Sequence, residues 1–133
     1  MNYLVKLLFT VVCILLTLNT SAQKINPEEE LARIRVVAFE GEFSEAEKYL
    51  HSLLDSFPAY GDARVMLARV YAWQQEYEKG LDIIEELLID EPENADAIEA
   101  KGDILRWMAG VAAEAEEAAS LQLAAAEKAL QDS

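Results

Sequence analysis

Residues suited to catalysis or metal binding are scarce in this chain. Histidine and cysteine occur once each, at His51 and Cys13. A single histidine without neighbouring cysteines provides neither a zinc ligand set nor a catalytic triad. We therefore expect His51 to be a solvated surface residue. The sequence also has no glycine-rich phosphate loop and no nucleophile elbow. These observations predict a protein that is not an enzyme and that holds no cofactor or metal.

Carboxylates are the one abundant reactive group, with 25 Asp and Glu residues in 133. Two carboxylates act as an acid and base pair only in a cleft that separates their pKa values. The runs Glu28–Glu30, Glu85–Glu86 and Glu116–Glu117 have spacings that a solvated helix surface explains. The acidic segment Asp90–Asp96 lacks the glycine and the closing glutamate of a calcium loop. We expect these acids to be solvated rather than catalytic.

The charge balance excludes one class of partner. The net charge is -14, and the 11 basic residues are scattered without a run. Nucleic-acid binding depends on clustered lysines and arginines that release counterions from phosphates. The sequence therefore predicts no nucleic-acid partner.

The N-terminal segment, Met1 to Ala22, has the three regions of a secretory signal peptide. Lys6 is followed by an apolar run from Leu7 to Leu18 and by a small, polar end at Asn19–Ala22. An uncleaved anchor is the alternative, but a spanning helix needs about 20 apolar residues. We expect cleavage after Ala22, export to the periplasm, a short linker at residues 23–26, and a mature chain without a thiol, since Cys13 lies in the removed segment.

The rest of the chain repeats itself with a 34-residue period. This alignment superimposes identical residues: Leu53-Leu54 on Leu87-Leu88, Pro58 on Pro92, Asp62-Ala63 on Asp96-Ala97, and Trp73 on Trp107. A fixed interval of this size indicates stacked structural repeats. The predicted units are residues 27–60, 61–94 and 95–133, the last being a partial repeat.

Each unit carries two amphipathic helical patterns. In the second unit the apolar residues at positions 63, 66, 67, 70 and 71 step by three and four, as do those at 81, 84, 87 and 88. The short turn Gln75–Tyr77 between them predicts an antiparallel helix pair. Pro58 and Pro92 end one pair, and Asp62 and Asp96 begin the next helix near its positive dipole end. We expect an all-α fold.

These units resemble the tetratricopeptide repeat over residues 27 to about 108. The features that carry the resemblance are the 34-residue period and the residues at fixed places in the unit: Ala46 and Gly80, Ala68 and Gly102, Phe43 and Tyr77, and Pro58 and Pro92. The resemblance implies a right-handed solenoid with small residues where helices approach closely. Ile34, in the place of Ala68 and Gly102, predicts a looser first pair.

The segments 68–80 and 101–110 are also similar to the helical repeats that precede the barrel in YaiO-type outer-membrane proteins. In such proteins an exported repeat segment leads into β-strands. Here an alanine-rich stretch, residues 111–133, follows instead. Two interpretations stay open: a truncated relative or fragment of such a protein, and a free-standing exported repeat protein. We expect the alanine-rich stretch to form a long capping helix that packs on the first helix of the third unit.

The resemblance implies a binding site on the concave face, which the first helices of the units line. The predicted site residues are Arg35, Asp62, Val65, Arg69, Asp96, Glu99, Asp103 and Arg106, and the row also includes Leu31, Ala38 and Ala72. Its mixed charge suits a peptide or a partner helix. The lysines and asparagines that clamp chaperone tails in related proteins are absent from it. We also expect Arg69 to pair with Asp103, as an exposed ion pair.

Two questions remain open from the sequence alone. Trp73 and Trp107 either pack against the turn or contact a partner at the rim of the groove. The function is expected to be an exported, non-catalytic module that binds a protein or peptide. The alternative is a structural spacer, or the repeat segment of an outer-membrane barrel protein. Membrane contact is expected only through an outer-membrane partner or an uncleaved signal segment.

Overall fold

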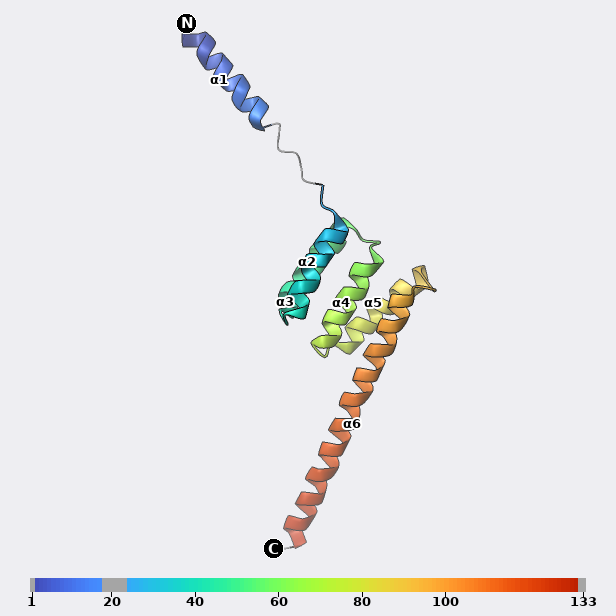
Figure 1. The fold of residues 1–133 in the computed structure, drawn as a ribbon. Coiled ribbons are helices and arrows are strands. Elements are labelled where there is room, and N and C mark those ends of the chain that lie inside the picture. The colour runs from blue at the N-terminus through green and yellow to red at the C-terminus, as the bar shows by residue number, and fades with distance from the viewer. Residues whose placement is uncertain (1, 18–23, 132–133) are drawn as a thin grey trace.

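The computed structural model describes residues 2–17 and 24–131 and, within them, contains helices and no strands. Its first helix is α1 (Asn2–Thr17), which contacts none of the other helices of the described chain and lies apart from them (Figure 1). No helix in the described ranges is both long and apolar enough to cross a membrane. The expected end of the apolar run at Leu18, the small-residue segment Asn19–Ala22 and the start of the exported product at Gln23 lie outside the described residues.

Two antiparallel helix pairs follow. The first consists of α2 (Pro27–Phe39) and α3 (Phe43–Ser56), and the second of α4 (Gly61–Trp73) and α5 (Tyr77–Asp90). The turn within the second pair is Gln74–Glu76, so Tyr77 begins α5 instead of ending the turn. Helices α2, α4 and α6 (Ala95–Gln131) begin at the residues where the 34-residue frame starts its three units.

Capping residues explain where α2 and α6 begin. The Asn26 side chain accepts a hydrogen bond from the Glu28 amide at 3.1 Å, and Pro27 occupies the first helical position, where its missing N–H costs nothing. The Asn94 side chain accepts from the Ala97 amide at 3.0 Å in the same way. Both asparagines therefore satisfy amides that the helix itself leaves without a partner.

The helices form a solenoid in which α4 lies between α2 and α6 (Figure 1). Helix α3 packs on both α2 and α4, and α5 packs on both α4 and α6, so each second helix joins two consecutive units. One core cluster lies between α2, α3 and α4, around Leu31, Ile34 and Leu50. The other lies between α4, α5 and α6, around Ile84, Leu87 and Ile104. The all-α, tetratricopeptide-like solenoid predicted from the sequence is confirmed.

Close helix contact explains one pair of small residues. A methyl group added to Gly80 would lie 2.8 Å from the Ala68 carbonyl oxygen, so α4 and α5 touch through their backbones there. Ala46, in the same place on α3, is fully buried. Gly102 differs from the prediction, because an added methyl group would meet nothing within 4 Å. Within the described chain, no helix covers α6 at that place.

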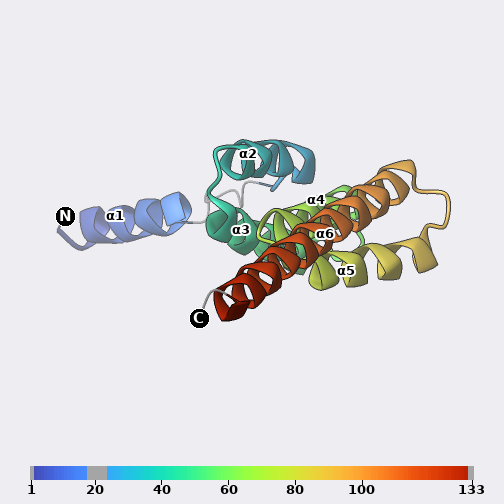
Figure 2. The same ribbon diagram turned by 90° about the horizontal axis from the view of Figure 1, so that it is seen from below.

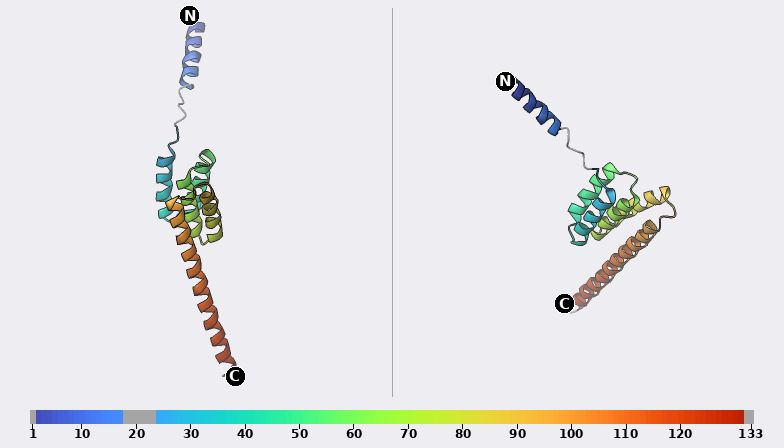
Figure 3. Two further views of the ribbon diagram at one scale, coloured as in Figure 1. Left: turned by 90° about the vertical axis from the view of Figure 1, so that its right-hand side faces the viewer. Right: turned by 45° about the horizontal axis from the view of Figure 1, so that its top comes forward.

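The structure also differs from the prediction of a capping helix that folds back. Helix α6 is one continuous helix of 37 residues, and its second half extends away from the other helices (Figures 1 and 3). Seen from below, α6 passes in front of α4 and α5 (Figure 2). From Met108 to Gln131 every residue is exposed. The two preceding turns each contain a residue with positive φ, Gly41 at 88° and Gln75 at 65°. Ala109 is the equivalent residue of the third unit, and there the helix continues where the earlier units turn.

Candidate functional site

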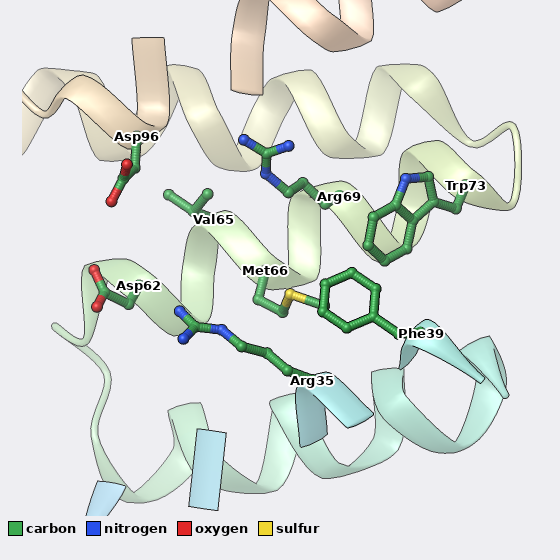
Figure 4. Close-up of a pocket in the computed structure, with 8 residues that line it drawn as sticks. All are labelled: Arg35, Phe39, Asp62, Val65, Met66, Arg69, Trp73 and Asp96. Atoms are coloured by element: carbon green, nitrogen blue, oxygen red, sulfur yellow. The ribbon is translucent and has the colours of Figure 1, made fainter. Parts of the chain in front are cut away.

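A pocket lies on the face formed by the first helices, between α2 and α4 (Figure 4). Its volume is about 270 Å³. Its lining residues come from α2, α4 and the first turn of α6: Arg35, Phe39, Asp62, Val65, Met66, Arg69, Trp73 and Asp96. Five of the eight residues predicted from the sequence, namely Arg35, Asp62, Val65, Arg69 and Asp96, are thus brought together.

The pocket has an apolar end. The rings of Phe39 and Trp73 lie with their centroids 5.7 Å apart, and Met66 lies beside them (Figure 4). The Trp73 ring also lies 5.9 Å from that of Phe43, which begins α3. Trp73 is half-buried and packs on the turn between α2 and α3, as one of the two interpretations predicted. It also lines the pocket, and contact with a partner there stays a prediction.

The opposite end of the pocket is charged. Arg35 extends from α2 toward Asp62, and Asp96 reaches the same end from the start of α6 (Figure 4). Arg35 is exposed, and within residues 2–17 and 24–131 it forms no ion pair or hydrogen bond. Its guanidinium is therefore available to a carboxylate or carbonyl of a ligand.

The remaining predicted residues form a charged group beside the pocket, on α6. Arg69 donates to Asp103 at 3.2 Å and lies 3.8 Å from Glu99, and Asp103 also contacts Arg106. The predicted pairing of Arg69 with Asp103 is confirmed. The pair is not exposed as expected, because the Arg69 and Asp103 side chains retain only 24% and 15% of their accessible surface. Glu99, Asp103 and Arg106 do not line the pocket.

Three apolar members of the predicted row lie elsewhere. Leu31, Ala38 and Ala72 are buried in the core clusters, with at most 3% exposure. At these positions of the repeat, the side chains point toward the neighbouring helices and not toward the open face. Conversely, Phe39 and Met66 line the pocket and were missed by the sequence analysis. A signal was available for Phe39, because it is the equivalent of Trp73 in the preceding unit and so ends α2 as Trp73 ends α4.

A second polar cluster joins α3, α4 and α5 away from the pocket. The Tyr71 hydroxyl donates to Glu47 at 3.1 Å and lies 3.0 Å from Nε2 of His51, while Lys79 lies 5.2 Å above the Tyr71 ring. Burial, together with the hydrogen bond to Glu47, raises the pKa of Tyr71 to about 12. His51 is thus exposed but has a hydrogen-bond partner, in contrast to the purely solvated residue expected. The cluster links consecutive units.

Within residues 2–17 and 24–131, no three or more histidine, cysteine or acidic side chains lie together in a way that could hold a metal ion. The pocket itself has an aromatic surface at one end and separate charges at the other.

Comparison with known proteins agrees with this geometry. A family model described as a tetratricopeptide repeat matches residues 40–104. The matched segment begins in the turn between α2 and α3 and ends within α6, so it leaves out α2. No curated protein matches the chain. Tetratricopeptide repeats generally mediate protein–protein interactions and are typically non-catalytic.

Proposed function

Because residues 40–104 belong to the tetratricopeptide repeat family, we propose that this chain is an exported, non-catalytic module that binds a peptide or a partner helix. The ligand lies across the face formed by α2, α4 and the start of α6. The observation that carries this proposal is the pocket between α2 and α4, with its aromatic end and its charged end.

The two ends of the pocket suit different parts of one ligand. An apolar or aromatic side chain fits against Phe39, Met66 and Trp73, since aromatic residues are frequent energetic anchors of protein interfaces. A polar group beside it reaches Arg35 or Asp62, whose charges fix its orientation. A peptide that combines an apolar anchor with a hydrogen-bonding backbone meets both requirements.

Export is supported by the composition of α1. Lys6 is its one charged residue, and the apolar side chains between Tyr3 and Phe9 are exposed. A short apolar segment after a single cation is typical of a signal peptide. We propose that the segment is removed after Ala22 and that the repeat domain acts in the periplasm, where an outer-membrane protein is a candidate partner. Mass spectrometry of a periplasmic fraction should find Gln23 as the first residue, and recovery of the intact chain from membranes would contradict cleavage.

Charge reversal at Arg35 tests the binding face. The protein and its Arg35→Glu variant would be used to capture partners from a periplasmic extract, with the captured proteins quantified by mass spectrometry. We expect the variant to lose the partner by at least about tenfold, as one charge-assisted hydrogen bond is replaced by repulsion. Circular dichroism should show an unchanged fold, because Arg35 is exposed and forms no ion pair or hydrogen bond in the described chain.

Arg33 provides the matched control. It lies two residues earlier on the same helix, is exposed, and pairs with Glu30 at 3.0 Å instead of lining the pocket. Arg33→Glu makes the same change of net charge and should retain the partner. Equal capture by the wild type and Arg35→Glu, or equal loss in both variants, would remove this face as the binding site.

A further inference from the structure

Helix α6 has one face that packs and an opposite face that does not. Ala97, Ala100 and Ile104 are buried against α4 and α5. On the opposite side Ile98 and Leu105 keep 53% and 46% of their accessible surface. Between these two lies Gly102, around which there is open space within 4 Å. The end of the solenoid therefore presents an apolar face.

The preceding unit shows what normally covers this face. On α4, Arg64 pairs with Asp90 of α5 at 3.4 Å, and the Ala68 carbonyl meets Gly80 of α5. The ring of Tyr71 is covered by Lys79 of α5. The equivalent residues of the third unit are Ile98, Gly102 and Leu105. Ile98 and Leu105 are more apolar than the Arg64 and Tyr71 that they replace. The vacant place thus fits a helix that runs antiparallel to α6.

The second half of the same α6 does not suit this place. Ala109 occupies the turn position at which Gly41 and Gln75 have positive φ. Glu114 occupies the place of Gly80, where even a methyl group would lie 2.8 Å from a carbonyl oxygen. A glutamate at that place would separate the two helices. A helix that is not joined by this turn is free to shift along α6 and avoid the clash.

The apolar face continues along the exposed half of α6. At alternating intervals of three and four residues it includes Ala109, Ala112, Ala119, Leu123 and Ala126, with Glu116 as the one charged member. Such spacing forms the seam of a coiled coil. Alanines at most of these places allow two helices to approach closely.

The order of large and small residues in this face is self-complementary. When a second α6 runs in the opposite direction, Leu105 lies beside Leu123 of the partner subunit and Gly102 beside Ala126 of the partner subunit. In the same register Ala109 lies beside the partner's Ala119. Large residues thus meet large ones, and small residues meet small ones, in these three layers, while the layers next to the two-fold axis place Ala112 beside Glu116 of the partner subunit.

We propose that two copies of this chain associate through an antiparallel pairing of their α6 helices. The exposed half of each α6 covers the apolar solenoid end of the other copy, in the place that a second helix of the third unit would fill. The arrangement is an exchange of equivalent segments across a two-fold axis, which is a common route to dimers. Because each copy carries a net charge of -14, the dimer should become tighter as salt screens the repulsion.

Sedimentation equilibrium of the full chain at about 0.15 M salt tests the proposal. We expect a concentration-dependent dimer. Leu123→Glu should weaken it by at least about 100-fold, because each dimer loses two buried leucines and gains two carboxylates. Leu121→Glu is the matched control, since Leu121 and Leu123 are both 64% exposed but lie on different faces of α6. A monomer at all concentrations, or equal weakening by both variants, would overturn the proposal.

Cysteine cross-linking tests the direction of the pairing. In a Cys13→Ser background, the double variant Leu105→Cys with Leu123→Cys should form a disulfide-linked dimer on mild oxidation. Each single variant should stay uncrosslinked, because an antiparallel seam places the two positions opposite each other. A control double variant, Leu105→Cys with Leu121→Cys, should not cross-link. Efficient cross-linking of Leu123→Cys alone would show a parallel arrangement and contradict the proposal.

Discussion

Arg69 is held between two carboxylates of α6, and this contact joins the second and third units of the solenoid. Since both partners of the Arg69–Asp103 pair are largely shielded from water, the pair should contribute more than the about 0–1 kcal/mol of an exposed ion pair. We expect Arg69→Ala to lower the free energy of unfolding by about 1.5–3 kcal/mol, the range for hydrogen bonds to charged groups. Arg33→Ala, which removes the exposed pair with Glu30, should cost at most about 0.5 kcal/mol. Urea unfolding curves would measure both, and equal losses would contradict the distinction.

Tyr71 should make the free energy of unfolding depend on pH at alkaline pH. Its pKa in the folded chain is raised to about 12 by burial and by Glu47, from 10.0. The folded state therefore keeps the hydroxyl proton where the unfolded chain has lost it. The stabilisation by this group is complete below about pH 10 and is lost as the pH rises toward 12. Melting temperatures of the wild type should fall more steeply over this window than those of Tyr71→Phe, and parallel curves would contradict the assignment.

At the residue scale, the sequence predicted polar positions better than apolar ones. The 34-residue frame assigns Arg35, Asp62, Arg69 and Asp96 to one face. Charged side chains in that row stay on the open face because burying them in the apolar core would be costly. Leu31, in the same row, is drawn into the core since a neighbouring helix lies close enough to cover it. That distance is a property of the packed structure, so no periodicity in a single helix reveals it.

At the scale of the elements, the contact of α4 with α5 depends on Gly80. Because an alanine methyl group there would lie 2.8 Å from the Ala68 carbonyl oxygen, Gly80→Ala should force the helices apart. We expect a loss of about 1–3 kcal/mol, as for other overpacked sites. Gly110→Ala is the control, since it adds a methyl group in open space on α6 and should stabilise that helix by up to about 1 kcal/mol. Thermal unfolding should show a lower melting temperature for Gly80→Ala and a higher one for Gly110→Ala. A higher melting temperature for Gly80→Ala would contradict the close contact.

The helices themselves were predictable, but the end of the last one was not. Apolar residues at steps of three and four, with prolines between the pairs, specify α2 to α5 because burial of one face is what makes each helix stable. The alanine-rich stretch after Gly110 has high helix propensity in either a folded-back or a continuous arrangement. Ala109 lies at the turn position where Gly41 and Gln75 have positive φ, and α6 continues through it. Because Gln75 has a side chain and still adopts positive φ, the residue type at this place does not by itself reveal whether the helix ends.

At the scale of the whole molecule, the first half of α6 closes the solenoid and the second half does not. Val65, Ile84 and Leu87 are buried beneath the first half. Glu99 and Arg106 are the equivalents, in the third unit, of Val65 and Ala72 in the second. These charged residues lie where the first helix of a fourth unit would pack and so end the stack, as terminal repeats generally do. The apolar face of Ile98 and Leu105 is a different one, where a second helix of the third unit would lie. The capping role expected of residues 111–133 therefore belongs to residues 95–107.

Two truncations test this division of α6. A chain that ends at Gly110 loses no buried side chain. At low protein concentration its free energy of unfolding should therefore change by no more than about 0.5 kcal/mol, and its melting temperature should change little. A chain that ends at Asn94 uncovers Val65, Ile84 and Leu87, each of which contributes about 1.5–3 kcal/mol by its burial. Their combined loss approaches the whole stability of a small domain, about 5–15 kcal/mol. We expect this shorter chain to unfold or aggregate, as judged by circular dichroism and light scattering. If the two truncations lowered the melting temperature equally, residues 111–131 would have a structural role in the monomer that their exposure does not explain.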